Sequence, residues 1–212
     1  MDSKVLFLEA YGDFFNKNFG AEFDEILNLY DQSKYFGYPQ EPSGSIFTSE
    51  GKSIYVLIRL LKPKRILEVG NFLGRSSNFI LKAVEDNGFG EVVLLDIEER
   101  LEYDKLHNKN FTRVLNDSLR YLDNPLSFDL FIVDGCHEYA HTKKELNLIS
   151  KNNTIDFWIW SHDYFMIKPP QCEVQRSWNE FYAENKQHIP VFQPMKEKTS
   201  DCGIAIAKYV KA

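Results

Sequence analysis

Four side chains in the second half of the sequence have the chemistry to move a proton or to hold a divalent ion. Asp134 and His137 lie three positions apart, and His162 and Asp163 are adjacent. Each pair follows a short apolar segment that is typical of a buried strand. If these strands are parallel neighbours, about 4.8 Å apart, both pairs lie at one edge of the same pocket. Two carboxylates and two imidazoles there could bind a hard ion such as Mg²⁺, or accept a proton from a substrate.

Ordinary structural roles compete with both of these functions. Asp134 and Asp163 could hydrogen-bond to loop backbone, and for His162 a structural role is as well supported as metal ligation. Cys136 lies beside His137, but no Cys-His-Asn set accompanies it. A small buried thiol is therefore the better interpretation than a nucleophile.

A glycine-containing turn earlier in the chain is the second candidate site. It has the sequence Glu68-Val-Gly70-Asn-Phe-Leu-Gly74-Arg-Ser76 and follows a predicted strand at 65–69. Gly70 allows a tight turn after the strand, and Gly74 allows backbone to approach a ligand where the next helix begins. In an open α/β sheet, ligands bind at this end of the strands. A plain strand-to-helix turn remains the alternative for the motif alone.

Asp96 strengthens the case for a nucleoside ligand. It ends the second predicted strand, where its carboxylate can accept both hydroxyl protons of an adenosine ribose. Nicotinamide-binding folds also place an acid at this point, but they need glycine where this chain has Phe72. The spacing Gly70-x-x-x-Gly74 further disfavours a dinucleotide pyrophosphate.

The elements that must position these residues alternate between strand and helix. Such alternation predicts an α/β fold with a mostly parallel sheet and helices on both faces. The last two strands form a closing hairpin, which puts an antiparallel C-terminal strand into a seven-stranded sheet. We expect strands at 65–69, 91–96, 112–115, 128–133, 156–160, 189–193 and 203–209, and helices within 3–31, at 48–61 and 76–86, from Glu98, and at 141–150 and 174–185.

Length and composition indicate one domain, residues 1–212. Residues 1–47 are expected to form a helical N-terminal segment whose Pro- and Gly-containing loop acts as a lid over the acceptor. The net charge of −6 argues against a nucleic-acid partner. The absence of a signal peptide, of a long apolar run and of paired cysteine spacing predicts a cytoplasmic protein with no membrane partner.

Taken together, the motifs resemble the class I S-adenosylmethionine (SAM) dependent methyltransferases. The similarity is to the branch of macrocin-type O-methyltransferases and cephalosporin-hydroxylase-like proteins, and it covers about residues 44–209. It implies a Rossmann-like fold and SAM as cofactor. The motifs that carry it are Glu68-x-Gly70-x-x-x-Gly74-x-Ser76, Asp96, Asn116-Asp117-Ser118, Asp134-Gly-Cys-His137-Glu-Tyr139 and His162-Asp163-Tyr164.

The resemblance assigns roles to individual residues. Glu68 and Gly70 would lie by the methionine part of SAM, Asp96 by the ribose, Asp117 by the adenine amino group, and the Ser118 backbone beside the ring. Asp117 equally suits a helix N-cap. The cofactor-binding set implied by the resemblance is Glu68, Gly70, Asn71, Gly74, Ser76, Asp96, Asp117, Ser118 and His137, and the catalytic set is His137, Asp134 and Asp163.

Macrocin-type relatives use a metal in this region, which implies Asp134, His162 and Asp163 as ligands for Mg²⁺. This chain departs from their pattern at Cys136 and at His162, where such relatives carry acids. The predicted function is O-methylation of a small hydroxylated acceptor, with a sugar as one candidate. A hydroxylase-like enzyme, or a SAM-binding protein without catalysis, stays open, as does a homo-oligomer.

Overall fold

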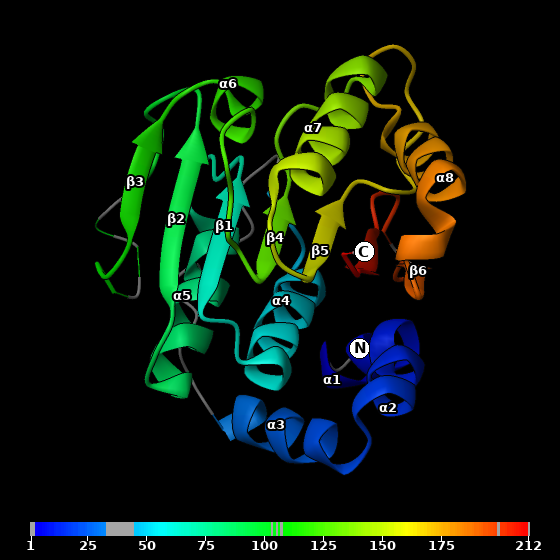
Figure 1. Ribbon diagram of the computed structural model, residues 1–212. Coiled ribbons are helices and arrows are strands. Elements are labelled where there is room, and N and C mark those ends of the chain that lie inside the picture. The colour runs from blue at the N-terminus through cyan, green and yellow to red at the C-terminus, as the bar shows by residue number, and fades with distance from the viewer. Residues whose placement is uncertain are drawn as a thin grey trace.

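The computed structural model describes residues 3–32, 45–102, 104, 106, 108–198 and 200–211. Its centre is a seven-stranded sheet with the order β3-β2-β1-β4-β5-β7-β6 (Figure 1). All neighbours from β3 to β5 pair in parallel, whereas β7 is antiparallel to both β5 and β6. The strands are β1 (Arg65–Val69), β2 (Glu91–Asp96), β3 (Thr112–Leu115), β4 (Leu130–Val133), β5 (Phe157–His162), β6 (Val191–Met195) and β7 (Ile204–Tyr209).

Helices cover both faces of this sheet, which confirms the predicted fold class. Strand residues alternate between two cores, because successive side chains point to opposite faces. Ile66 packs in the core under the N-terminal helices, and Leu67 packs in the core under the later ones. The first layer holds α1 (Ser3–Phe7), α2 (Asp13–Phe19), α3 (Ala21–Gln32), α4 (Thr48–Leu61) and α5 (Arg75–Asn87), and the second holds α6 (Ser118–Leu122), α7 (Tyr139–Asn152) and α8 (Val174–Asn185).

The segment after β2 differs from the sequence prediction. Helix was expected from Glu98, but residues 98–102 and 108–111 are not helical. Their backbone groups bond elsewhere: the Glu98 carbonyl accepts from Arg113, and the Glu102 N–H donates to the Leu73 carbonyl. Leu101 packs into the core beside Gly74. These contacts with other segments outweigh the local helical pattern.

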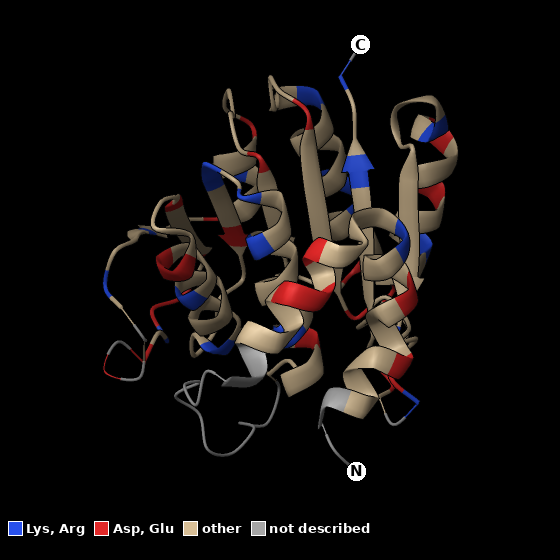
Figure 2. Ribbon diagram, turned by 90° about the horizontal axis from the view of Figure 1, so that it is seen from below, with Lys and Arg blue, Asp and Glu red and all other residues tan. Residues whose placement is uncertain are grey.

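The N-terminal helices contribute aromatic rings to the first core. Phe7, Phe15 and Phe23 are fully buried, and the Phe15 ring stacks on Phe23 with centroids 5.3 Å apart. The expected lid loop lies largely at 33–44, outside the described residues, so its closing over the acceptor stays a prediction. Charges of both signs are interspersed along the helices (Figure 2). Among the described helices, none combines the length and the hydropathy needed to span a membrane.

Candidate active site

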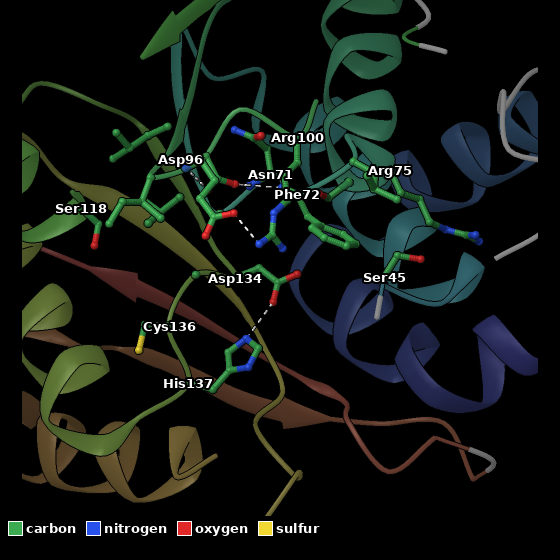
Figure 3. Close-up of a pocket in the computed structure, with 18 of the residues that line it drawn as sticks. Ser45, Asn71, Phe72, Arg75, Asp96, Arg100, Ser118, Asp134, Cys136 and His137 are labelled. Carbon is green, nitrogen blue, oxygen red and sulfur yellow. Dashed lines mark hydrogen bonds and ion pairs between the residues drawn. The ribbon is translucent and has the colours of Figure 1, made fainter. Parts of the chain in front are cut away.

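A cavity of about 610 Å³ opens at the carboxyl ends of β1, β2 and β4. Figure 3 shows Ser118 at one end of it, Ser45 and Arg75 at the other, and Asp134 facing His137 between them. This is the position at which a parallel α/β sheet binds its ligands. The volume is that of a small-molecule site.

The turn after β1 is built around Gly70. Its φ of +81° is in the left-handed region, and a Cβ there would lie 2.2 Å from the carbonyl oxygen of Asp134. Only glycine therefore fits between β1 and the segment that follows β4. Gly74 also has positive φ, but the space it leaves is filled by Leu101 and Leu106 rather than by the cavity. Its observed role is packing of the turn, and the approach of backbone to a ligand there stays a prediction.

Asp96 holds this turn in place while lining the cavity. One carboxylate oxygen accepts from the backbone N–H groups of Asn71 and Phe72, each at 3.0 Å, and the other accepts from the Glu98 N–H at 3.1 Å. An ionised carboxylate has about four acceptor positions, so Asp96 retains capacity for ligand hydroxyls. Asn71 lines the same cavity with both polar side-chain atoms buried and without a hydrogen-bond partner.

Glu68 lies beneath the turn and is fully buried. Burial raises the pKa of its carboxyl to about 8, and the nearby charges of Asp134 and Asp96 act in the same direction. The Ser77 hydroxyl donates to one carboxyl oxygen, and the other oxygen has no partner. Glu68 does not line the cavity, so its predicted contact with the methionine part of SAM stays a prediction.

The four acid and histidine side chains of the second candidate site come together. His137 lies between two carboxylates, with Nε2 3.4 Å from Asp134 Oδ1 and Nδ1 3.3 Å from Asp163 Oδ2. His162 Nδ1 lies 3.1 Å from the same Asp134 oxygen. Asp134 and His137 line the cavity, whereas His162 and Asp163 are buried beneath it.

This arrangement changes the pKa of each member. Burial lowers the pKa of His137, but the hydrogen bond and charge of Asp134, with the charge of Asp163, outweigh burial and raise it. Burial likewise opposes the charged form of Asp134, yet the two histidines hold the pKa of that carboxyl below its usual value. The cluster therefore stabilises ion pairs at and beneath the wall of the cavity.

Comparison with known proteins shows a partial similarity to one family. Residues 67–164 match the family model described as a methyltransferase domain. In this segment the chain is similar to methyltransferases. No curated protein sequence matches the chain significantly.

Solved structures of methyltransferases share this fold. An O-methyltransferase from Bacillus cereus with S-adenosylhomocysteine superposes with a TM-score of 0.62 at 14% identity, covering 94% of this chain and 96% of that one. A methyltransferase from Podospora anserina, also bound to S-adenosylhomocysteine, gives 0.62 at 16% identity over 91% and 97%. TomG from Streptomyces achromogenes, an O-methyltransferase of tomaymycin synthesis in complex with SAM, gives 0.60 at 16% identity over 94% and 95%.

Two of the remaining predicted residues, Asp117 and Ser118, stand at the start of α6. Asp117 is the N-cap of α6 and accepts from the Arg120 N–H at 3.0 Å, which is the alternative the sequence left open. It also lines the cavity, as do Ser76 and Ser118. The Ser118 hydroxyl lies 2.9 Å from His141 Nε2. Contacts of Asp117 and Ser118 with adenine stay predictions.

Sequence reasoning missed several residues of the site. Arg75, Arg100 and His141 line the cavity, but helix or loop positions gave no reason to select them. Glu50 of α4 was missed in a different way. It caps the start of α4 by accepting the Phe47 N–H at 2.8 Å. The same carboxylate oxygen also lies 2.9 Å from His162 Nε2, across 112 residues of sequence.

Proposed function

We propose that this methyltransferase transfers the methyl group of SAM to a hydroxyl group of a small molecule, and a sugar is one candidate acceptor. One observation carries the proposal: a single cavity is lined both by Asp96, suited to a ribose, and by Asp134 and His137, suited to a hydroxyl.

The described residues suit each part of SAM. Asp96 offers acceptor positions to two ribose hydroxyls, and the unpartnered amide of Asn71 offers a donor and an acceptor to the amino acid end. When bound, SAM supplies an electrophilic methyl group on a positively charged sulfur. The carboxylate of Asp134, at the edge of the same cavity, favours positive charge there.

His137 is the group placed to take the proton of the acceptor. As the new O–C bond forms, the S–C bond breaks, S-adenosylhomocysteine leaves and the hydroxyl proton passes to the imidazole. The positive charge thus moves from sulfur to His137, where Asp134 and Asp163 stabilise it. Positioning of the two reactants supplies much of the acceleration, and proton removal adds about 10²–10⁴-fold.

The metal site predicted from the resemblance does not fit the donors in this structure. Both ring nitrogens of His162 face carboxylates, Nδ1 that of Asp134 and Nε2 that of Glu50. A nitrogen that carries a proton toward a carboxylate has no lone pair for a metal. We therefore include no Mg²⁺ ion bound by Asp134, His162 and Asp163 in the mechanism.

Calorimetry and a turnover assay test the proposal. In calorimetry, SAM and S-adenosylhomocysteine should bind and NADH should not. Binding of NADH without binding of SAM would refute the proposal. Incubation with SAM and a panel of hydroxylated molecules should release S-adenosylhomocysteine.

His137→Gln should slow turnover by about 10²-fold or more at unchanged SAM affinity, whereas Cys136→Ala, a neighbouring change in the same cavity, should not. SAM binding without turnover on any acceptor would indicate a binding protein, and a hydroxylated product without S-adenosylhomocysteine would indicate the hydroxylase-like alternative.

We also propose a reducing compartment such as the cytoplasm as the site of action. Cys136, Cys172 and Cys202 are all free thiols, which such a compartment preserves. Absence of a nucleic-acid partner remains part of the proposal, and fluorescence anisotropy with labelled DNA or RNA would test it. The oligomeric state can be measured by light scattering.

A further inference from the structure

A chain of buried polar groups connects the N-terminal helix layer to the cavity. Glu50 of α4 is fully buried, and its carboxylate contacts His162 Nε2 at 2.9 Å. His162, 6% exposed at the end of β5, contacts Asp134 through Nδ1 at 3.1 Å. Asp134 contacts His137, which lines the cavity. His162 thus lies one step, and Glu50 two steps, behind the residues that can touch a substrate.

The partners of His162 fix its protonation. Neutral imidazole has one N–H and one lone pair, whereas imidazolium has two N–H groups. Here a carboxylate lies opposite each nitrogen, and a lone pair facing either one would be repelled. Asp163 Oδ1 adds a third carboxylate oxygen, 3.4 Å from Nδ1 and without a hydrogen bond. Burial opposes the charge, but Asp134 and Glu50 outweigh it and raise the pKa of His162 well above its usual value.

The surroundings of this imidazolium keep it in one orientation. The Trp160 ring lies parallel to it, with centroids 5.9 Å apart. The other oxygen of Glu50 lies 3.5 Å from the Ser200 hydroxyl, so the carboxylate is held from two sides. Besides the three acids, the titratable groups near His162 include His137, Cys172 and Cys202. Tyr11 lies near Glu50 and near a further acid, Glu197.

The positive charge of His162 lies close to both Asp134 and Asp163. Asp134 and Asp163 follow neighbouring parallel strands and would repel each other if nothing positive lay between them. In a metal-using site a divalent cation could bridge such a pair. Here His162 Nδ1 lies within 3.4 Å of an oxygen of each aspartate.

We propose that His162 is the built-in cation of this site, filling the role of a divalent ion between Asp134 and Asp163, and that Glu50 is the positioning residue that holds it there. The proposal rests on the methyl-transfer function argued above and adds that the transfer needs no metal. It assigns Glu50 and His162 an indirect role, since they set the charge and position of Asp134 and through it the pKa of His137.

The first experiment does not depend on turnover. In the wild-type protein, ¹⁵N NMR should show both nitrogens of His162 protonated from about pH 6 to pH 8. Glu50→Gln should lower the pKa of His162 and shift that of His137, while Ser200→Ala, which alters only the other side of Glu50, should leave both unchanged. A neutral His162 at pH 7 in the wild type would overturn the proposal, and so would identical titrations in the wild type and Glu50→Gln.

The second experiment measures metal binding. Mn²⁺ followed by electron paramagnetic resonance should not bind to the wild-type site, whereas His162→Asp replaces the cation by a carboxylate and should bind Mn²⁺ and gain thermal stability with Mg²⁺. Wild-type binding that Asp134→Asn abolishes would refute the proposal. If His162→Asp fails to fold, the NMR titrations and the wild-type Mn²⁺ measurement still decide.

Turnover separates this proposal from the one on which it rests. Wild-type methyl transfer should be unchanged by chelator, and loss of activity on chelation that Mg²⁺ restores would refute the built-in cation. Failure to bind SAM would instead refute methyl transfer itself. In that case the NMR and Mn²⁺ experiments would still test whether His162 is the cation between Asp134 and Asp163.

Discussion

Glu68 gives a quantitative prediction about stability and pH. Its carboxyl is fully buried, and burial raises its pKa to about 8 from an ordinary value near 4.5. Between these two pH values the unfolded chain releases the proton while the folded protein keeps it. The free energy of unfolding then falls by about 1.4 kcal/mol for each unit of pH, because the unfolded state binds fewer protons than the native state.

The change that isolates this effect is Glu68→Gln, which has nearly the same shape and no titrating group. From pH 5 to pH 7.5 the wild type should lose about 3 kcal/mol through Glu68 alone. The variant should not, so the two proteins should have similar stability at pH 5, and the variant should be more stable by up to about 3 kcal/mol at pH 7.5. The Ser77 hydroxyl can still donate to the amide oxygen of the new side chain.

Urea unfolding of both proteins at several pH values measures this difference, and other titrating groups cancel because both proteins contain them. Glu184→Gln is a matched control, since its side chain is 57% exposed on α8 and pairs with Lys143 at the surface. Its stability difference from the wild type should stay nearly constant with pH. A constant difference for Glu68→Gln as well would show that Glu68 is ionised in the native protein and that the burial argument is wrong.

Four further predictions follow from the site and the core. Asp96→Ala should weaken SAM binding by about 1–3 kcal/mol in calorimetry, because two hydrogen bonds to a charged group are lost; unchanged affinity would exclude the ribose contact. Gly70→Ala should lower the melting temperature far more than Gly88→Ala, since both have positive φ but only at Gly70 does the added Cβ meet backbone, at 2.2 Å; equal losses would mean that the contact with Asp134 relaxes. The value of kcat/KM should rise with pH through an apparent pKa above 6.5, because His137 must be neutral to accept a proton and its carboxylate neighbours raise its pKa; a profile flat from about pH 6 to pH 9 would argue against a histidine base. Phe15→Ala should cost about 3–5 kcal/mol in urea unfolding, as expected for a fully buried ring, and a loss below about 1 kcal/mol would show that the N-terminal helices are not part of the cooperative core.

The sequence predicted the fold well where local pattern and tertiary contacts agree. The helix at Val174–Asn185 and the strand ending at Asp96 were located correctly because apolar spacing reports directly which face is buried. The segment after Asp96 was predicted wrongly because its backbone groups bond to Leu73 and Arg113. No local pattern encodes those partners.

The residues of the site were likewise predictable only where a local pattern indicates their position. Asp134 and Asp163 could be placed together, because the carboxyl ends of neighbouring parallel strands meet at one edge. Glu50 could not, since nothing near it in the sequence indicates that its carboxylate reaches His162. Gly74 shows a third case. The sequence suggested that glycine there lets backbone approach a ligand, whereas the space it leaves in the structure accommodates Leu101 and Leu106, which no local pattern indicates.

The place of β7 in the sheet has a consequence for the order of folding. β7 lies between β5 and β6, so β6 has no other neighbour in the sheet and stays unattached until Ile204–Tyr209 arrives. While the chain emerges from the ribosome, the edge of β5 is therefore open after five strands have formed, and open edges favour aggregation. His162 pairs with Ile204 at that edge. In chains that stop short of residue 204, β7 is missing and β6 has no strand to pair with, so the sheet lacks both. His162 then has no neighbouring strand at the edge of β5. Interrupted synthesis should therefore yield inactive, aggregation-prone protein.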